Sequence, residues 1–138
     1  MSEQTESKPA SQPARRVVVA EDETLIRLDI IEILKGEGYD VVGEADNGEK
    51  AVQLAEELKP DLVLMDVKLP GLDGITLTRM LKSDPKTARI PVVALTAHAM
   101  KGDEQEALAA GCAAYITKPI EVAQFLRRIT SFLEAGRP

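Results

Sequence analysis

The stretch DLVLMDVKLPGLDG, Asp61–Gly74, is the part of the chain from which the fold is most directly predicted. Four consecutive apolar residues, LVLM, run into the carboxylate of Asp66, and a turn-forming segment follows at once. A continuous apolar run of this length is typical of a strand buried on both faces, as in a parallel sheet. The stretch therefore predicts a buried strand with one acidic side chain at its carboxyl end.

Four more apolar runs of this kind alternate with segments of helical periodicity. The predicted strands, each expected to be buried on both sides, are 17–20, 39–45, 61–66, 91–96 and 113–118. The predicted helices are 23–35, a segment from the Asn47 cap to the residue before Lys59, 74–82, 102–110 and 120–135. Because crossovers between parallel strands are right-handed, this alternation predicts a (βα)5 doubly wound, flavodoxin-like fold with a five-stranded parallel sheet of order 2-1-3-4-5.

The length of 138 residues is typical of one domain. Residues 1–14 are polar and rich in Ser, Gln and Pro, which predicts a disordered N-terminal tail. The domain is expected to cover residues 15–135, with 136–138 as a short C-terminal tail. No second domain fits in what remains.

Composition excludes several classes of function. The net charge of −6, from 23 acidic and 17 basic residues, opposes direct binding of nucleic acid. The single cysteine, Cys112, excludes an internal disulfide and is expected to be a small buried residue. A polar N-terminus and the lack of a long apolar run predict a cytoplasmic protein that does not contact the membrane.

Polar residues stand where four of the five predicted strands end. Glu21 and Asp22 follow the first strand, Asp66 ends the third, Thr96 ends the fourth, and Lys118 ends the fifth. Ligands of doubly wound sheets bind outside the carboxyl ends of the strands, so these side chains are expected to share one site. Taken singly, each is more often a turn former or a structural residue. Their occurrence together at one edge favours a functional site.

The residue types at this edge predict phosphoryl transfer. Three converging carboxylates repel one another, and a Mg²⁺ ion, which prefers oxygen ligands, would relieve that repulsion. The Lys118 ammonium and the Thr96 hydroxyl are donors suited to phosphoryl oxygens. Asp66 is then the predicted nucleophile, which would form an acyl phosphate.

Four motifs, VVVAEDE, DLVLMDVKLPGLDG, PVVALTA and YITKP, resemble those of the response regulator receiver domain of bacterial two-component signalling. The resemblance covers residues 15–134. Its first half is similar to receivers of RNA-binding antitermination regulators, and its second half to single-domain cell-cycle receivers. The resemblance implies the following site residues: Asp66 as the phosphorylated residue; Glu21, Asp22, Asp66 and the Lys68 main-chain carbonyl as metal ligands; Thr96 and Tyr115 as switch residues; and Lys118 as the phosphate-binding lysine. It also implies a cis Lys118–Pro119 bond.

One departure from the family concerns Glu21, since the family most often has Asp at this position. The extra methylene leaves direct ligation of the metal by Glu21 open, because the longer side chain can also reach the ion through water.

The implied function is that of a single-domain response regulator. It would accept a phosphoryl group on Asp66 from a sensor histidine kinase or histidine phosphotransferase, catalysing its own phosphorylation and dephosphorylation. It would then act on a downstream protein partner or pass the group on in a phosphorelay. The alternative is a binding module that acts in its unphosphorylated state, as an allosteric partner or a phosphate sink.

The family also implies where a kinase docks, at the start of the first helix and the loop after the lysine. The implied docking residues are Leu25, Ile26, Asp29, Pro119 and Ile120. Helical periodicity places Ile26, Ile30, Ile33 and Leu34 on the sheet-facing stripe. Leu25, Leu28 and Ile31 fall outside it, and Leu28 and Ile31 could add a second contact or a dimer face. The protein is expected to be a monomer or a weak dimer.

Two other classes of protein fit the residues less well. A phosphatase of the haloacid dehalogenase kind needs an Asp where this chain has Ala20. A flavodoxin needs a phosphate-binding loop after the first strand, but the acidic segment Glu21–Glu23 would repel a phosphate.

Overall fold

The computed structural model describes residues 14–71, 73–96, 101–118 and 120–135. Within them, strands and helices alternate as predicted, and their ends lie within two residues of the predicted ones. The elements are β1 (Arg16–Ala20), α1 (Thr24–Gly36), β2 (Asp40–Ala45), α2 (Gly48–Leu58), β3 (Leu62–Asp66), α3 (Gly74–Ser83), β4 (Val92–Thr96), α4 (Lys101–Ala110), β5 (Ala114–Thr117) and α5 (Val122–Ala135). The predicted tails lie outside the described residues, except for Ala14, so the tail boundaries stay predictions.

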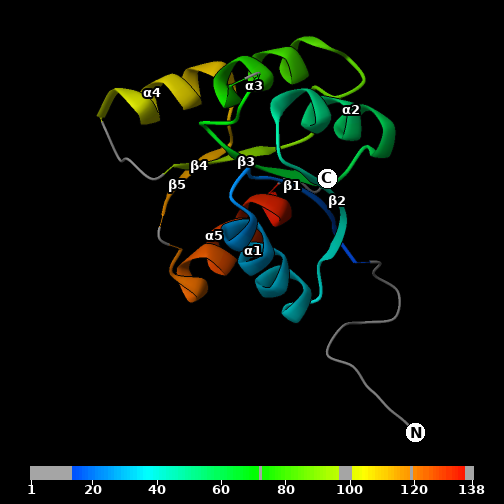
Figure 1. Ribbon diagram of the computed structural model, residues 1–138, viewed down its shortest axis with the longest axis vertical. Coiled ribbons are helices and arrows are strands. Elements are labelled where there is room, and N and C mark those ends of the chain that lie inside the picture. The colour runs from blue at the N-terminus through cyan, green and yellow to red at the C-terminus, as the bar shows by residue number, and fades with distance from the viewer. Residues whose placement is uncertain (1–13, 72, 97–100, 119, 136–138) are drawn as a thin grey trace, which may run out of the picture.

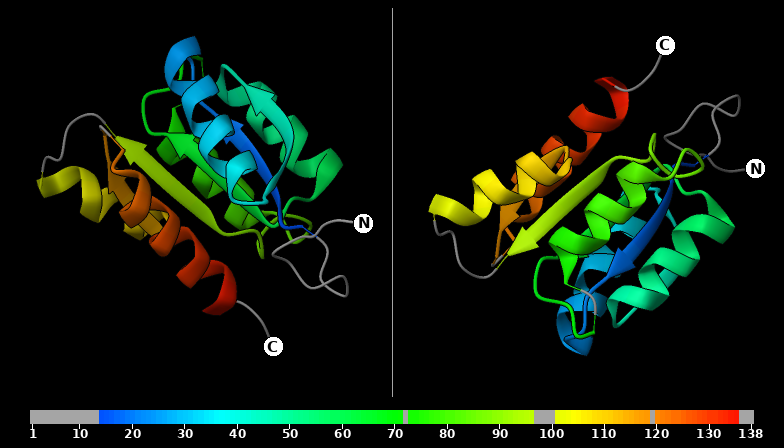
Figure 2. Two further views of the ribbon diagram at one scale, coloured as in Figure 1. Left: turned by 90° about the horizontal axis from the view of Figure 1, so that it is seen from below. Right: turned by 90° about the horizontal axis from the view of Figure 1, so that it is seen from above.

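The five strands form one parallel sheet of order β2-β1-β3-β4-β5, which confirms the predicted topology. Helices α1 and α5 cover one face, and α2, α3 and α4 cover the other (Figures 1 and 2). Each face has its own apolar core: Ile30, Leu34 and Phe125 belong to the first, and Leu77 and Leu81 to the second. The strands all point the same way, so their carboxyl ends share one edge of the sheet.

The prediction that every strand is buried on both sides is wrong for β2. Residues of β1, β3 and β4 are almost all buried, whereas Asp40 and Glu44 of β2 are exposed and Val41, Val42 and Gly43 are only half-buried. β2 is an edge strand that pairs with β1 alone and carries Asp40 and Glu44, whereas the other edge strand, β5, is buried from Ala114 to Ile116.

The predicted faces of α1 need a correction at Ile31. Its side chain is buried on the sheet with Ile30 and Leu34, so Ile31 cannot contribute to an exposed second contact. Leu25 and Leu28 are exposed as predicted, with 82% and 48% of their surface accessible. The apolar stripe of α1 is wide enough to include neighbouring residues, because a core-facing helix commonly buries an arc of 100° or more.

Two smaller features concern α5 and the cysteine. Phe125, Ile129 and Leu133, spaced four residues apart, are buried on the sheet, but Val122, at the first turn of α5, is 47% exposed. Cys112 is buried, as predicted. Within the described residues no helix is both long and apolar enough to cross a membrane, and the cytoplasmic location stays a prediction.

The start of α3 packs tightly against the end of β3. The Gly74 amide donates to the Val67 carbonyl at 2.9 Å. A Cβ on Gly74 would lie 2.8 Å from the main-chain oxygen of Asp66, closer than real Cβ contacts, so glycine is required here. Asp73 caps the helix by accepting from the Thr76 amide at 2.9 Å. The loop after Asp66 is therefore held at both of its ends.

Candidate functional site

Three acidic side chains meet at the carboxyl edge of the sheet. Glu21 and Asp22 follow β1 and Asp66 ends β3, and one carboxylate oxygen from each lies within 4.8 Å of the others. Glu21 is completely buried and Asp66 is 6% exposed, whereas Asp22 faces solvent. The strands bring these residues together because β1 and β3 are neighbours in the sheet. This group of carboxylates could hold a metal ion.

Lys118 lies directly against two of the acids. Its Nζ donates to Glu21 Oε1 at 2.8 Å and to Asp66 Oδ2 at 3.1 Å, and only 11% of its side chain is exposed. Its own amide donates to the Thr96 carbonyl at 2.7 Å, which ties the end of β5 to the end of β4. The Lys118 ammonium, which follows β5, therefore bridges the acidic side chains at the ends of β1 and β3.

Burial and pairing act in opposite directions on the charges of this site. Burial raises the pKa of Glu21 above its usual value, although the hydrogen bonds from Lys118 and from the Glu23 amide oppose that rise. Burial alone would lower the pKa of Lys118, but its hydrogen bonds to Glu21 and Asp66, with their charges, outweigh burial and raise it. Lys118 therefore stays protonated at neutral pH.

The second oxygen of Asp66 is held by the loop that follows it. The Lys68 amide donates to Asp66 Oδ1 at 3.0 Å, and the Lys68 side chain is exposed. Both carboxylate oxygens of Asp66 therefore have a donor, one from the main chain and one from Lys118. The donors orient the Asp66 carboxylate, which is itself almost completely buried.

Both side-chain oxygens of Glu21 also have donors within the protein. Oε1 accepts from Lys118, and Oε2 accepts from the Glu23 amide at 3.1 Å. Its own amide donates to the Ala45 carbonyl at the end of β2 at 2.9 Å. The longer side chain of Glu at this position thus reaches the lysine, and Asp22 is the more accessible acid of the pair.

Thr96 and Tyr115, the two predicted switch residues, are both buried. Tyr115 pairs with Ala94 across β4 and β5 and belongs to the core under α2, α3 and α4. Thr96 lies two residues after Ala94, so strand alternation directs its side chain toward the same side of the sheet. The structure places both residues on the face opposite α1 and α5, with Thr96 at the functional edge.

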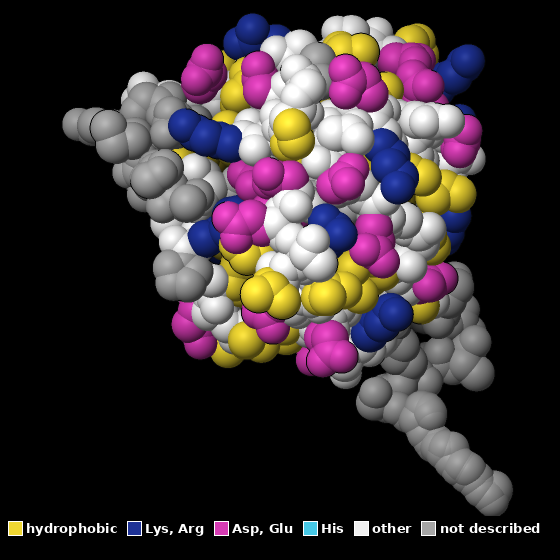
Figure 3. Space-filling model, in the orientation of Figure 1, with side chains coloured by type: hydrophobic (Ala, Val, Ile, Leu, Met, Phe, Trp, Pro, Cys, Tyr) yellow, Lys and Arg dark blue, Asp and Glu magenta, His cyan; other side chains and the backbone are white. Residues whose placement is uncertain are grey.

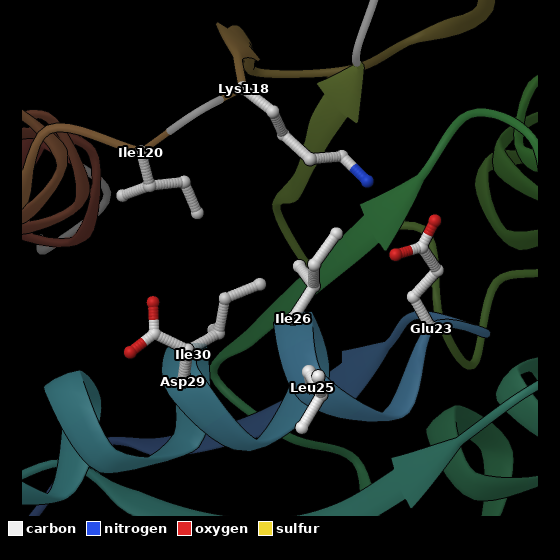
Figure 4. A pocket seen from close by; sticks show the side chains of 7 residues that line it. All are labelled: Glu23, Leu25, Ile26, Asp29, Ile30, Lys118 and Ile120. Carbon is white, nitrogen blue, oxygen red and sulfur yellow. The ribbon is translucent and has the colours of Figure 1, made fainter.

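A pocket of about 640 Å³ lies beside Lys118, between α1 and the segment after β5 (Figure 4). Four of the five predicted docking residues line it, and the fifth, Pro119, lies outside the described residues, as does the predicted cis bond. The four are Leu25, Ile26, Asp29 and Ile120. Figure 4 shows them on the two walls of the pocket, with Lys118 extending across it.

Exposed hydrophobic residues continue from this pocket over α1 and α5. Leu25, Leu28 and Val122 all have large accessible fractions. In Figure 3, hydrophobic side chains lie over the lower part of the molecule, where these two helices lie, with acidic and basic side chains among them. The pocket is therefore bordered by exposed apolar side chains.

Sequence reasoning missed Arg27, which contacts the acidic segment from α1. Its Nη1 donates to the Glu21 carbonyl at 2.7 Å, and its Nε lies 3.2 Å from Glu44 Oε1 on β2. A signal was present in the sequence, since an arginine in the second turn of a helix can reach back to the loop before it. The partner on β2 could not be identified without the tertiary structure.

The buried acids and the lysine lie at the carboxyl edge of a doubly wound parallel sheet, which is where domains of this fold class bind their ligands. The family model of the response regulator receiver domain matches residues 17–130, and the chain belongs to this family. The predicted family is thus confirmed, and with it the role of a receiver in phosphorylation-dependent signalling.

Curated relatives come from two kinds of regulator. The polar-differentiation response regulator DivK of Brucella anthropi is 42% identical over 119 residues, which cover 86% of this chain and 96% of DivK. The transcriptional regulatory protein PdtaR of Mycobacterium tuberculosis is 47% identical over 116 residues, which cover 83% of this chain. The matched region spans 55% of PdtaR, so the chain corresponds to about half of that relative.

Solved receiver structures share the fold along nearly the whole chain. The receiver domain of sensor histidine kinase PA1611 from Pseudomonas aeruginosa, with a magnesium ion in its active-site cleft, is 33% identical with a TM-score of 0.81, covering 88% of this chain and 98% of that one. The receiver domain of NarL from Mycobacterium tuberculosis is 27% identical with a TM-score of 0.82, covering 89% and 98%.

Proposed function

We propose that Asp66 is the residue that accepts the phosphoryl group, from a phosphohistidine on a sensor kinase or histidine phosphotransferase. The observation that carries the proposal is the environment of its carboxylate. Asp66 lies between a buried ammonium and a main-chain amide, among acids that could hold a metal ion. In the reaction, one Asp66 oxygen bonds to phosphorus as the phosphorus–nitrogen bond breaks, and the electron pair returns to the imidazole.

Mg²⁺ is the proposed metal. The donor set fits it, because hard carboxylate oxygens are the ligands that Mg²⁺ prefers. Asp22 and Asp66 would ligate it directly, together with the Lys68 carbonyl. Glu21, whose oxygens are held by Lys118 and the Glu23 amide, would act through water. When bound, the ion neutralises charge on the carboxylates and on the phosphoryl oxygens.

Lys118 holds the phosphoryl group through its ammonium. Its raised pKa keeps the ammonium charged. The ammonium already contacts Asp66 Oδ2, so it is close to the position where a phosphoryl group on Asp66 would add negative charge. Thr96, at the end of the adjacent strand β4, would donate its hydroxyl to another phosphoryl oxygen. The contacts of Lys118 and Thr96 with phosphoryl oxygens would exist only after phosphorylation, so they would favour the phosphorylated conformation.

Tyr115 is the proposed second part of the switch. It lies next to β4 on the same side of the sheet as Thr96, so movement of Thr96 toward the phosphoryl group would open space beside the ring. The response would alter the surface of α4, β5 and α5, which a downstream partner would bind. A phosphorelay would use the same chemistry to pass the group to a second histidine.

The pocket beside Lys118 is the proposed docking site for the phosphodonor protein. It combines an apolar rim with the Asp29 carboxylate and lies next to the cation that contacts Asp66. Leu25, with 82% of its surface exposed, is suited to act as an apolar anchor in a partner groove.

Phosphorylation is tested directly by intact-mass measurement. We expect acetyl phosphate with Mg²⁺ to add the mass of one phosphoryl group to the wild-type protein. In EDTA the addition should fall to a small fraction, because the carboxylates then repel the incoming phosphate. No added mass in Mg²⁺, or equal labelling in EDTA, would contradict the proposal.

Leu25→Asp is expected to separate docking from chemistry. Transfer from a kinase that phosphorylates the wild type should slow by about tenfold or more, since a charge replaces an apolar anchor. Labelling by acetyl phosphate should not change. Leu108→Asp on α4 is the matched control, because Leu108 is also exposed but lies on the opposite face. Equal loss of kinase transfer in both variants would argue against this docking site.

A further inference from the structure

We infer that Arg27 is a positioning residue for the metal site, an inference that rests on the function proposed above. Its guanidinium spans two elements: Nη1 donates to the Glu21 carbonyl at 2.7 Å, and Nε donates to Glu44 Oε1 at 3.2 Å. Only 16% of the Arg27 side chain is exposed, against 50% for Glu44. Arg27 therefore joins α1 and β2 to the main chain immediately before Asp22.

The contact with the Glu21 carbonyl determines how Asp22 is presented. That carbonyl belongs to the peptide group that links Glu21 to Asp22, and the peptide group is planar. A hydrogen bond that fixes the oxygen thus fixes the orientation of the Asp22 amide and limits the directions open to its side chain. Asp22 is exposed, so its side chain has little packing of its own to hold it.

The start of α1 has no side-chain cap, which is the usual restraint on the first turn of a helix. Its N-cap residue is Glu23, and this residue makes no side-chain capping hydrogen bond. The segment between β1 and α1 is instead held by the Glu21 amide on Ala45, the Glu23 amide on Glu21 Oε2, and Arg27. Of these, Arg27 holds the peptide group that precedes Asp22, and the Glu23 amide holds the one that follows it.

A simple ion pair does not explain this arrangement. Glu44 is half exposed, and ion pairs of this kind contribute little to stability. The guanidinium has donors in a fixed planar fork, so one arginine can hold a carbonyl and a carboxylate at the same time. Lysine has the same charge but only a single ammonium at the end of its stem. The geometry thus uses a property specific to arginine.

The direction in which Mg²⁺ affinity changes distinguishes a positioning role of Arg27 from a simple effect of its charge. Arg27 is a cation close to a cation site, so by Coulomb repulsion alone its removal would tighten Mg²⁺ binding. If Arg27 positions Asp22, its removal weakens Mg²⁺ binding instead. Arg27→Lys keeps the charge and loses the fork, so only the positioning role predicts weaker binding for it.

The experiment is calorimetric titration of the metal-free protein with MgCl₂. The dissociation constant should rise by about tenfold in Arg27→Lys and in Arg27→Ala, as is typical when a residue that orients a metal ligand is removed. Arg127→Ala is the control, since Arg127 is exposed on α5 and should leave the dissociation constant unchanged. At saturating Mg²⁺ the acetyl phosphate labelling rate of Arg27→Lys should return close to that of the wild type.

The outcomes distinguish this inference from the proposed function. If wild-type protein binds Mg²⁺ and both Arg27 variants bind it equally well or more tightly, the positioning role is wrong and the proposed function stands. If the wild type does not bind Mg²⁺, both the positioning role and the proposed function are wrong. Thermal unfolding in EDTA monitors the fold, and Arg27→Lys decides the question should Arg27→Ala prove unfolded.

Discussion

Asp66→Asn is expected to lower acetyl phosphate labelling by at least about a hundredfold, as loss of a nucleophile does in enzymes. The amide of Asn has nearly the shape of the carboxylate and keeps an oxygen for the Lys68 amide, which contacts Asp66 Oδ1 at 3.0 Å. It lacks the anionic oxygen that bonds to phosphorus. The measurement is a time course of intact mass in Mg²⁺.

Asp40→Asn is the matched control for this experiment. Asp40 is exposed at the first residue of β2, so it lies at the amino edge of the sheet, far from the carboxyl edge. It should label like the wild type. Persistent labelling of Asp66→Asn at the wild-type rate would assign the phosphoryl group to another residue and overturn the proposed site.

Lys118→Met is expected to destabilise the metal-free protein, by about 3 kcal/mol at pH 8. The variant leaves Glu21 buried without the cation that lies 2.8 Å from it in the wild type. A charged carboxylate in that position is costly, because its desolvation is no longer offset. Far-UV circular dichroism during urea unfolding measures the change, since the chain has no tryptophan.

The loss of stability in Lys118→Met should depend on pH in a defined direction. Burial raises the folded-state pKa of Glu21, and the loss of the Lys118 hydrogen bond raises it further. A group with a raised folded-state pKa contributes stability that is present below its ordinary value of 4.5 and is lost as the pH rises through the folded-state value. The deficit of Lys118→Met should therefore be largest near pH 8 and should shrink as the pH falls toward 5.

Two variants check the cause of this effect. Adding Glu21→Gln to Lys118→Met should recover much of the lost stability, because a neutral side chain needs no cation. Lys50→Met, at an exposed position of α2, should leave the free energy of unfolding nearly unchanged. A deficit that is the same at every pH would show that lost packing, and not the charge of Glu21, is responsible.

The site was largely predictable because parallel topology converts sequence order into spatial order. Once the five apolar runs are recognised as parallel strands, residues at their carboxyl ends must share one edge. Glu21, Asp22, Asp66 and Lys118 were expected together for this reason, and their carboxylates and ammonium do meet. Their roles in phosphorylation came from the resemblance to receivers and stay open to the experiments above.

The sequence by itself determined the alternation of strands and helices and their approximate ends, because apolar runs, caps and glycines act locally. The order of the sheet followed from this alternation and the right-handed crossovers between parallel strands. Only the tertiary structure decided that β2 is half exposed and that Ile31 is buried. It also decided that Glu21 pairs with Lys118 and that Arg27 reaches Glu44. These features depend on which elements become neighbours and how closely they approach. Local periodicity does not contain that information, because it does not say how the elements pack against one another.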